Sequence, residues 1–234
     1  MVAVGALVGL LVVEAVVARR RDYPFEAYER VSHRAGGKGD PLRVAMLGDS
    51  TVAGVGAPTV EGTLPAQTAE RVAAALGRPV VVDGFGVSGV RTGQVLGMQG
   101  EDLEDYDVVV VVIGSNDVTH LTPPWVLRRH TAALLDGLPK PVVLGGIPLF
   151  GGATAMPRPL RDLVRLYAKV LRGVQIDVTA GRGGVTFVNI AVEASPRFRG
   201  VPDAMSTDGF HPAPTGYGFW ADALAAGILR AVPG

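Results

Sequence analysis

The sequence contains no cysteine, few histidines and no excess of charge of either sign. The absence of cysteine excludes disulfide bridges, thiolate zinc sites, iron–sulfur clusters and a cysteine nucleophile. Only four histidines occur in 234 residues, so we expect no histidine-rich metal site. Lys+Arg and Asp+Glu both number 22. This balance argues against nucleic acid as a partner, because nucleic-acid-binding proteins usually carry a basic excess.

The composition is that of a folded protein with one large core. Hydrophobic residues make up 48% of the chain and charged residues 19%, which excludes wholesale disorder. The chain is rich in glycine, with 32 residues, and in proline, with 17, but neither recurs at a fixed period. The glycine excess therefore predicts many tight turns and loops close to a ligand.

The N-terminal segment differs from the rest of the chain. Residues 2–18 are apolar except for Glu14, and Arg19, Arg20 and Arg21 follow at once. A secretory signal carries its positive charge before the apolar run, and the positive-inside rule keeps such a cluster in the cytoplasm. We therefore predict a hydrophobic membrane anchor over residues 1–21, a linker over 22–41 and a cytoplasmic domain over 42–234. A secreted or periplasmic domain is the alternative, and a plain buried helix is a third interpretation.

Short apolar runs alternate with helical patterns through the rest of the chain. The predicted strands cover residues 42–47, 79–83, 107–113, 142–144 and 185–189, and the predicted helices cover 64–76, 92–103, 123–138, 160–180 and 215–231. The first helix has Thr63 in position for an N-cap and Gly77 just beyond its end. This alternation predicts a five-stranded parallel sheet covered by helices on both faces, a three-layer α/β/α sandwich.

Polar segments occur where ligands bind in such a sheet, in loops at the carboxyl ends of strands. Ser50 lies on a tight turn after the first strand, and His211 and Asp208 share one loop after the last strand. A serine, a histidine base and a carboxylate that orients the imidazole form an acyl-transfer site. Glycine in the segment 84–89 and asparagine in 113–117 are able to donate hydrogen bonds to an oxyanion.

These segments, in this order, resemble the sequence blocks of the SGNH (GDSL-type) hydrolases. VAMLGDSTVAG carries Ser50, GFGVSG carries Gly86, IGSND carries Asn116, and DGFHP carries Asp208 and His211. The resemblance implies that Ser50 is the nucleophile and that Asp208 and His211 complete its triad. It also implies an oxyanion hole formed by the backbone N–H groups of Ser50 and Gly86 and by the side chain of Asn116.

The resemblance further implies a flavodoxin-like fold and an enzyme that acts on ester bonds with no metal and no cofactor. We predict a serine esterase or acyl hydrolase that cleaves a small-molecule or lipid ester through an acyl-enzyme on Ser50. An acyltransferase with the same triad and a non-catalytic, membrane-tethered binding domain are the alternatives. The sequence departs from the family at Gly84, where asparagine is usual, and this removes a supporting hydrogen bond.

The substrate and the oligomeric state are less well defined by the sequence. The segment 148–157 is apolar and glycine-rich, and we interpret it as one wall of an acyl pocket, a lid or a packed loop. Arg91, Arg158 and Arg161 are candidates for contacts with an anionic head group, although surface arginines are common. The membrane anchor favours a lipid-like or acylated substrate.

Overall fold

The structure, a computed structural model, describes residues 27–95, 103–150 and 156–232. The predicted anchor over residues 1–21 lies outside the described residues, as does most of the predicted helix over 92–103. Among the helices that the structure describes, none is both long enough and apolar enough to cross a membrane.

A six-stranded sheet forms the centre of the described chain, in the order β1-β3-β2-β4-β5-β6. Strands β2 to β6 run parallel, and β1 pairs antiparallel with β3 at the edge. The strands are β1 (Val31–Ala35), β2 (Leu42–Gly48), β3 (Val80–Gly86), β4 (Val108–Val112), β5 (Val142–Gly145) and β6 (Val185–Val188). The predicted five parallel strands are all present.

The edge strand β1 corrects the predicted strand count from five to six. It lies inside the segment 22–41 that we expected to be a linker. The sequence VSHRA buries only its first and last residues, Val31 and Ala35, and its interior residues are polar. Polar side chains are typical of edge strands, which have one partner and one free edge. The segment is a strand because it pairs with β3. Its sequence contains no apolar run from which a strand could be predicted.

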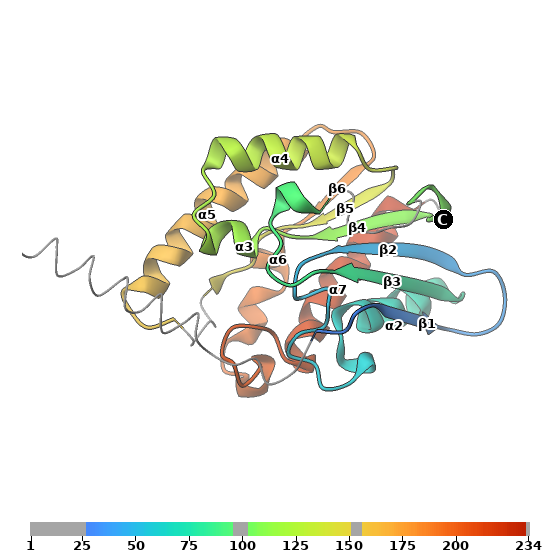
Figure 1. Cartoon of the computed structure of the whole chain (residues 1–234). Helices are drawn as coiled ribbons and strands as arrows, with labels where there is room; N and C mark the ends of the chain where they lie inside the picture. The colour runs from blue at the N-terminus through green and yellow to red at the C-terminus, as the bar shows by residue number, and fades with distance from the viewer. Residues whose placement is uncertain (1–26, 96–102, 151–155, 233–234) are drawn as a thin grey trace, which may run out of the picture.

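Helices cover both faces of the sheet, which confirms the predicted three-layer α/β/α sandwich. Figure 1 shows α4 and α5 on one side of the sheet and α2 and α7 on the other. The α-helices are α2 (Leu64–Leu76), α3 (Ser115–Thr119), α4 (Pro124–Asp136), α5 (Leu160–Thr179), α6 (Ile190–Glu193) and α7 (Pro214–Ala231). Short 3-10 helices cover Val60–Gly62 (η1), Thr92–Gln94 (η2), Leu103–Asp105 (η3), Ser195–Phe198 (η5) and Pro202–Ala204 (η6).

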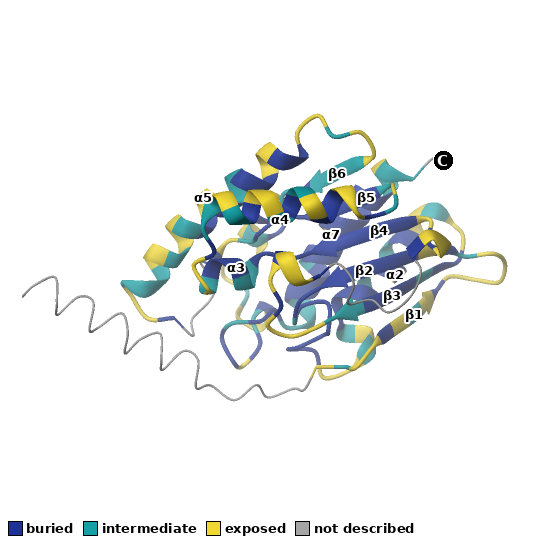
Figure 2. Cartoon of the chain, turned by 45° about the horizontal axis from the view of Figure 1, so that its top comes forward, coloured by how far each residue is buried: buried dark blue, intermediate teal, exposed yellow. Residues whose placement is uncertain are grey.

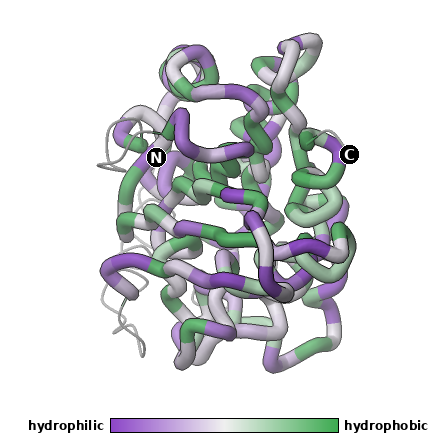
Figure 3. Tube along the Cα trace, turned by 90° about the vertical axis from the view of Figure 1, so that its right-hand side faces the viewer, coloured by the Kyte–Doolittle hydropathy of each residue, from purple (hydrophilic) through white to green (hydrophobic). Residues whose placement is uncertain are grey.

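Two hydrophobic cores fill the spaces between these layers. Successive residues of β2 alternate between them: Val44 and Met46 pack toward α2 and α7, whereas Ala45 and Leu47 pack toward α4 and α5. The central strands are buried on both faces, and α4 and α5 expose their outer sides (Figure 2). Figure 3 shows hydrophobic and hydrophilic stretches alternating along the trace.

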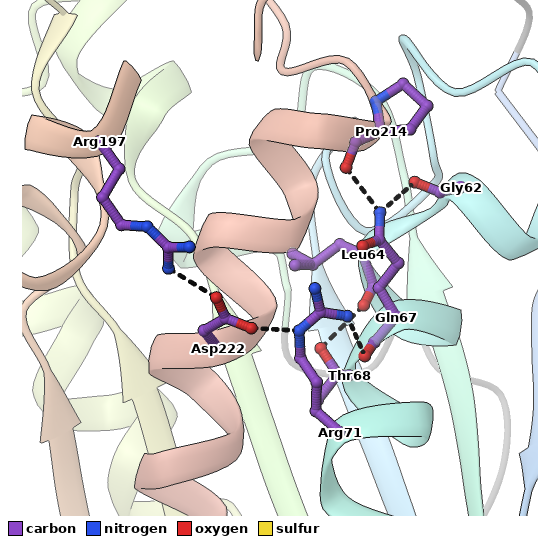
Figure 4. A network of polar contacts seen from close by, with 8 residues as sticks. All are labelled: Gly62, Leu64, Gln67, Thr68, Arg71, Arg197, Pro214 and Asp222. Carbon is purple, nitrogen blue, oxygen red and sulfur yellow. Dashed lines mark hydrogen bonds and ion pairs between the residues drawn. The ribbon is translucent and has the colours of Figure 1, made fainter. Parts of the chain in front are cut away.

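Polar contacts fasten α7 to α2 on one face of the sheet (Figure 4). Gln67 of α2 donates its side-chain amide to the carbonyl oxygens of Gly62 at 2.9 Å and Pro214 at 2.7 Å. Arg71 of α2 forms an ion pair with Asp222 of α7. Because Pro214 is the first residue of α7, these contacts fix the start of that helix and the loop that leads into it.

Candidate active site

The serine at position 50 lies on a tight turn directly after β2. The buried Asp49 carboxylate accepts hydrogen bonds from the backbone N–H of Thr51 at 3.0 Å and its hydroxyl at 2.9 Å. Burial raises the pKa of the Asp49 carboxyl above its usual range, although the two bonds from Thr51 oppose the shift. A Cβ on Gly48 would lie 2.3 Å from the carbonyl oxygen of Val112, so a glycine is needed where the end of β2 approaches β4. Asp49 therefore shapes the turn that presents Ser50.

Ser50, His211 and Asp208 lie in hydrogen-bond contact in the order that the sequence predicts. The Ser50 Oγ is 2.8 Å from His211 Nε2, and His211 Nδ1 is 2.6 Å from Asp208 Oδ2. His211 and Asp208 are buried, whereas Ser50 is partly exposed. With Nδ1 donating to the carboxylate, Nε2 is left to accept the proton of the serine hydroxyl.

The Asp208 carboxylate is held as an anion by its own loop. Burial acts to raise the pKa of Asp208. Hydrogen bonds from the His211 side chain and from the backbone N–H groups of Phe210 and His211 outweigh burial and lower this pKa below its usual value. The two backbone bonds are 2.7 and 2.9 Å long. The site thus combines an ionised carboxylate with a buried imidazole.

A buried tyrosine on α7 contacts the backbone of the segment that follows Ser50. The hydroxyl of Tyr217 donates a hydrogen bond to the carbonyl oxygen of Val55, whose own N–H donates to Ser50 O at 3.0 Å. Burial raises the pKa of Tyr217 well above its usual value, and the nearby carboxylates of Asp49 and Asp208 add to the rise. Sequence reasoning missed this residue, because a tyrosine in a helix carries no motif.

Asn116 lies in the first turn of α3, directly after β4, and faces the same cavity as Ser50 and His211. Its side-chain nitrogen donates a hydrogen bond to the carbonyl oxygen of Val90 at 2.9 Å. A primary amide has two N–H groups, so a second donor remains for a substrate oxygen. The structure therefore brings Asn116 to the site in a position that suits the predicted oxyanion role.

Two of the three glycines in the GFGVSG segment, Gly86 and Gly84, have packing reasons that the sequence does not show. A Cβ on Gly86 would lie 2.1 Å from the backbone nitrogen of Ala53, in the turn after Ser50. Gly86 is not among the described residues that line the cavity, and its predicted role as a donor stays a prediction. At Gly84, a Cβ would lie 2.9 Å from the ring of Pro65, so a larger residue such as asparagine would require a shift there.

A cavity of about 400 Å³ opens above the serine. Ser50, Asn116 and His211 line it, and most of its remaining wall is apolar. The larger apolar side chains are those of Leu149, Phe150, Phe198, Met205, Phe210 and Trp220, and three prolines complete the apolar wall. Residues 148–150 of the predicted substrate segment 148–157 thus form part of the wall, whereas residues 151–155 lie outside the described part. The cavity is suited to an apolar group held beside the serine hydroxyl.

The arginines that we considered for an anionic head group lie elsewhere. Arg91 lines a second, smaller cavity, Arg158 pairs with Asp162 at 3.6 Å, and Arg161 donates to the carbonyl of Met156 at 2.8 Å. Arg165 and Arg199 line the cavity above the serine instead. Within residues 27–95, 103–150 and 156–232, no group of three or more histidine, aspartate or glutamate side chains is able to hold a metal ion.

The three-layer fold, the nucleophile turn and the Ser–His–Asp arrangement define an SGNH-type hydrolase. The chain belongs to the GDSL-like lipase/acylhydrolase family, whose profile matches residues 46–219. The resemblance seen in the sequence is thereby confirmed.

One curated relative is a GDSL-like esterase of Mycobacterium tuberculosis, 27% identical over 220 residues that cover 91% of this chain. The match spans 65% of that relative's own length.

Two solved structures share the fold. A lipase/acylhydrolase from Enterococcus faecalis is 21% identical with a TM-score of 0.64, covering 82% of this chain and 97% of its own. A variant of an acetyl xylan esterase from Geobacillus stearothermophilus is 17% identical with a TM-score of 0.60, covering 84% and 98%. At these identities the comparison shows the fold alone.

Proposed function

We propose that this chain is a serine esterase that cleaves the ester of a lipid-like or acylated substrate through an acyl-enzyme on Ser50. The observation that carries the proposal is the 2.8 Å contact between Ser50 Oγ and His211 Nε2, with Asp208 at 2.6 Å on the far side of the imidazole. Membership of the GDSL-like lipase/acylhydrolase family supports the same chemistry.

In the first half-reaction, His211 accepts the hydroxyl proton as Ser50 Oγ attacks the acyl carbonyl carbon. The imidazolium that forms is stabilised by the Asp208 carboxylate. His211 then gives its proton to the alcohol oxygen, the ester bond breaks and the acyl group stays on Ser50. In the second half-reaction His211 takes a proton from water as the water oxygen attacks the acyl carbonyl carbon. His211 then gives this proton to Ser50 Oγ as the acyl–oxygen bond breaks, which releases the acid and restores the serine hydroxyl.

The oxyanion of each tetrahedral intermediate is held by hydrogen bonds from the backbone N–H groups of Ser50 and Gly86 and from the Asn116 amide. The placement of Asn116 at the cavity wall supports its part in this assignment. The loss of one such donor raises the barrier by about 3–4 kcal/mol.

A series of p-nitrophenyl esters of increasing acyl length tests the proposal. We expect the wild-type chain to hydrolyse them, and we expect Ser50→Ala to abolish turnover without unfolding the protein. Ser88→Ala is a matched control, because Ser88 is exposed and lies outside the cavity wall. Hydrolysis that survives Ser50→Ala would overturn the proposal.

The same assay separates this proposal from the two alternatives. Transfer of the acyl group to an added alcohol in preference to water would identify an acyltransferase. No turnover and no labelling of Ser50 by a fluorophosphonate would identify a non-catalytic binding domain.

We also propose that residues 1–21 attach the chain to a membrane and that the catalytic domain lies on the cytoplasmic side. The apolar run and the three arginines that follow it support this proposal. A secreted or periplasmic domain remains the alternative. Attachment would bring the cavity close to lipid-like esters.

A further inference from the structure

We propose that the catalytic cavity selects an ester that carries an anionic group, a phosphate or carboxylate, and that Arg199, assisted by Arg165, binds this group. The inference rests on the proposed function, since it names the substrate class of the same site. Both arginines are among the residues that line the cavity of Ser50 and His211.

Among the residues that the structure describes, Arg199 has no counter-ion. It follows η5 directly, and its exposed side chain has no hydrogen-bond or ion-pair partner among the described residues. Arg197 in the same segment forms an ion pair with Asp222 and stacks on Phe219, with its guanidinium carbon 4.2 Å from the ring centre. Arg197 is therefore held by contacts within the protein, and Arg199, which lines the cavity, is left for a ligand.

The other charged groups of the wall leave this part of the cavity positive. Arg165 on α5 shares its charge with Asp162 at 3.6 Å, and its side chain is 48% exposed. Asp49 is the only carboxylate among the described wall residues, and it is buried and bonded to Thr51. The fourth ionisable group, His211, is occupied by Ser50 and Asp208.

The backbone between Ile147 and Leu149 joins the two segments that carry these arginines. The N–H of Leu149 donates to the side-chain oxygen of Ser195, at the start of η5, at 3.1 Å. Arg172 of α5 donates to the carbonyl oxygens of Ile147 at 3.3 Å and Pro148 at 3.4 Å. The cavity wall, η5 and α5 are thus fastened together, which holds Arg199 and Arg165 around one volume.

A cavity lined by apolar side chains and by arginines indicates an amphiphilic ligand. Aromatic and aliphatic side chains suit an apolar chain, and a free guanidinium suits the planar, two-oxygen edge of a phosphate or carboxylate. A neutral ester uses the apolar wall alone. An anionic ester uses both, and its charged group also draws it toward the cavity at low ionic strength.

Calorimetric titration of the full-length protein with butyl phosphate, 1-butanol and inorganic phosphate tests the inference. We expect butyl phosphate to bind about tenfold more tightly than either of the others, and added NaCl to weaken this preference. Arg199→Gln should reduce the affinity for butyl phosphate about tenfold, and Arg165→Gln should reduce it less, because Asp162 already shares that charge. Arg129→Gln is the control, since Arg129 is exposed on α4 outside the cavity and its loss changes the net charge equally.

Equal affinity of butyl phosphate for wild type, Arg199→Gln and Arg165→Gln would overturn the inference. Equal binding of butyl phosphate and inorganic phosphate would reduce the site to one for free phosphate and would also overturn the inference. Because titration involves no turnover, its result is separate from the proposed function. That proposal fails if the wild-type chain does not hydrolyse p-nitrophenyl esters in a Ser50-dependent way.

Discussion

Asp208 is the residue at which charge and geometry are most closely linked. Its carboxylate orients the His211 imidazole at 2.6 Å and stabilises the imidazolium formed during the reaction. Asp208→Asn replaces the anion with a neutral amide of the same shape. We expect kcat for p-nitrophenyl acetate to fall on the order of 10³–10⁴-fold with little change in the fold. Retained kcat would show that the carboxylate does not act through His211.

The same substitution changes the pH dependence of stability. The folded state lowers the pKa of Asp208, so its contribution to stability is fully present above the unfolded value of about 3.9. The contribution is lost as the pH falls through the lower, folded-state pKa. Urea unfolding of wild type and Asp208→Asn should therefore show the largest difference in free energy near neutral pH and a shrinking one in acid. A difference that grows in acid would contradict the direction of the shift.

Gly86 tests the packing of the nucleophile turn. In Gly86→Ala the new methyl group would lie 2.1 Å from the Ala53 nitrogen, and backbone is unable to yield as a flexible side chain does. We expect about 3 kcal/mol of lost stability, at the upper end for overpacking, together with lower activity. Gly37→Ala is the control, since nothing lies within 4 Å of a Cβ there. Equal melting temperatures for the two variants would contradict this packing.

Among single residues, the sequence motifs predicted the three side chains of the Ser–His–Asp arrangement and missed residues around it. Ser50, Asp208 and His211 occur in short segments whose residue types suit one chemistry, and the structure brings them together. Tyr217 reaches the nucleophile turn through Val55, and Arg199 lines the cavity, but nothing next to either residue in the chain signals this.

Among the elements, α2 and α7 depend on a shared carboxylate. Asp222 of α7 pairs with Arg71 of α2 and with Arg197, and these ion pairs hold its pKa low against the effect of burial, which acts to raise it. Asp222→Asn should cost about 1 kcal/mol of unfolding free energy, because each partly exposed pair contributes little. High salt should reduce the loss.

A matched substitution on the other face of the sheet provides the control. Asp177→Asn removes one exposed pair with Arg128, and we expect a smaller loss of unfolding free energy than for Asp222→Asn. If Asp177→Asn and Asp222→Asn lose the same free energy of unfolding, the second ion pair of Asp222, with Arg197, adds no stability.

The contrast between α2 and β1 shows which elements are predictable from local sequence. The predicted helix 64–76 is confirmed to the residue, because its end signals are local: Thr63 accepts the Ala66 N–H and Gly77 takes a left-handed φ of 63°. The strand β1 exists because β3 offers it an edge, and that edge lies about fifty residues away in the chain. Pairing of this kind has no local signal in a polar segment.

For the whole molecule, the proposed membrane attachment is tested by sedimentation with membranes. We expect the full chain to sediment and a chain that begins at residue 22 to stay in the supernatant. The shorter chain lacks the apolar run over residues 2–18 that would enter the membrane. Both chains should hydrolyse a soluble ester equally, because the catalytic residues are present in each. Equal sedimentation of both chains would contradict the assignment of residues 1–21 as an anchor.

Mass spectrometry of the trapped intermediate tests most directly whether Ser50 carries the acyl group. The chain is mixed with a p-nitrophenyl ester, quenched in acid within the first turnover and digested. We predict one acyl adduct, on the peptide that contains Ser50, and none in Ser50→Ala. An adduct on another residue, or release of p-nitrophenol with no adduct at any time, would contradict an acyl-enzyme on Ser50.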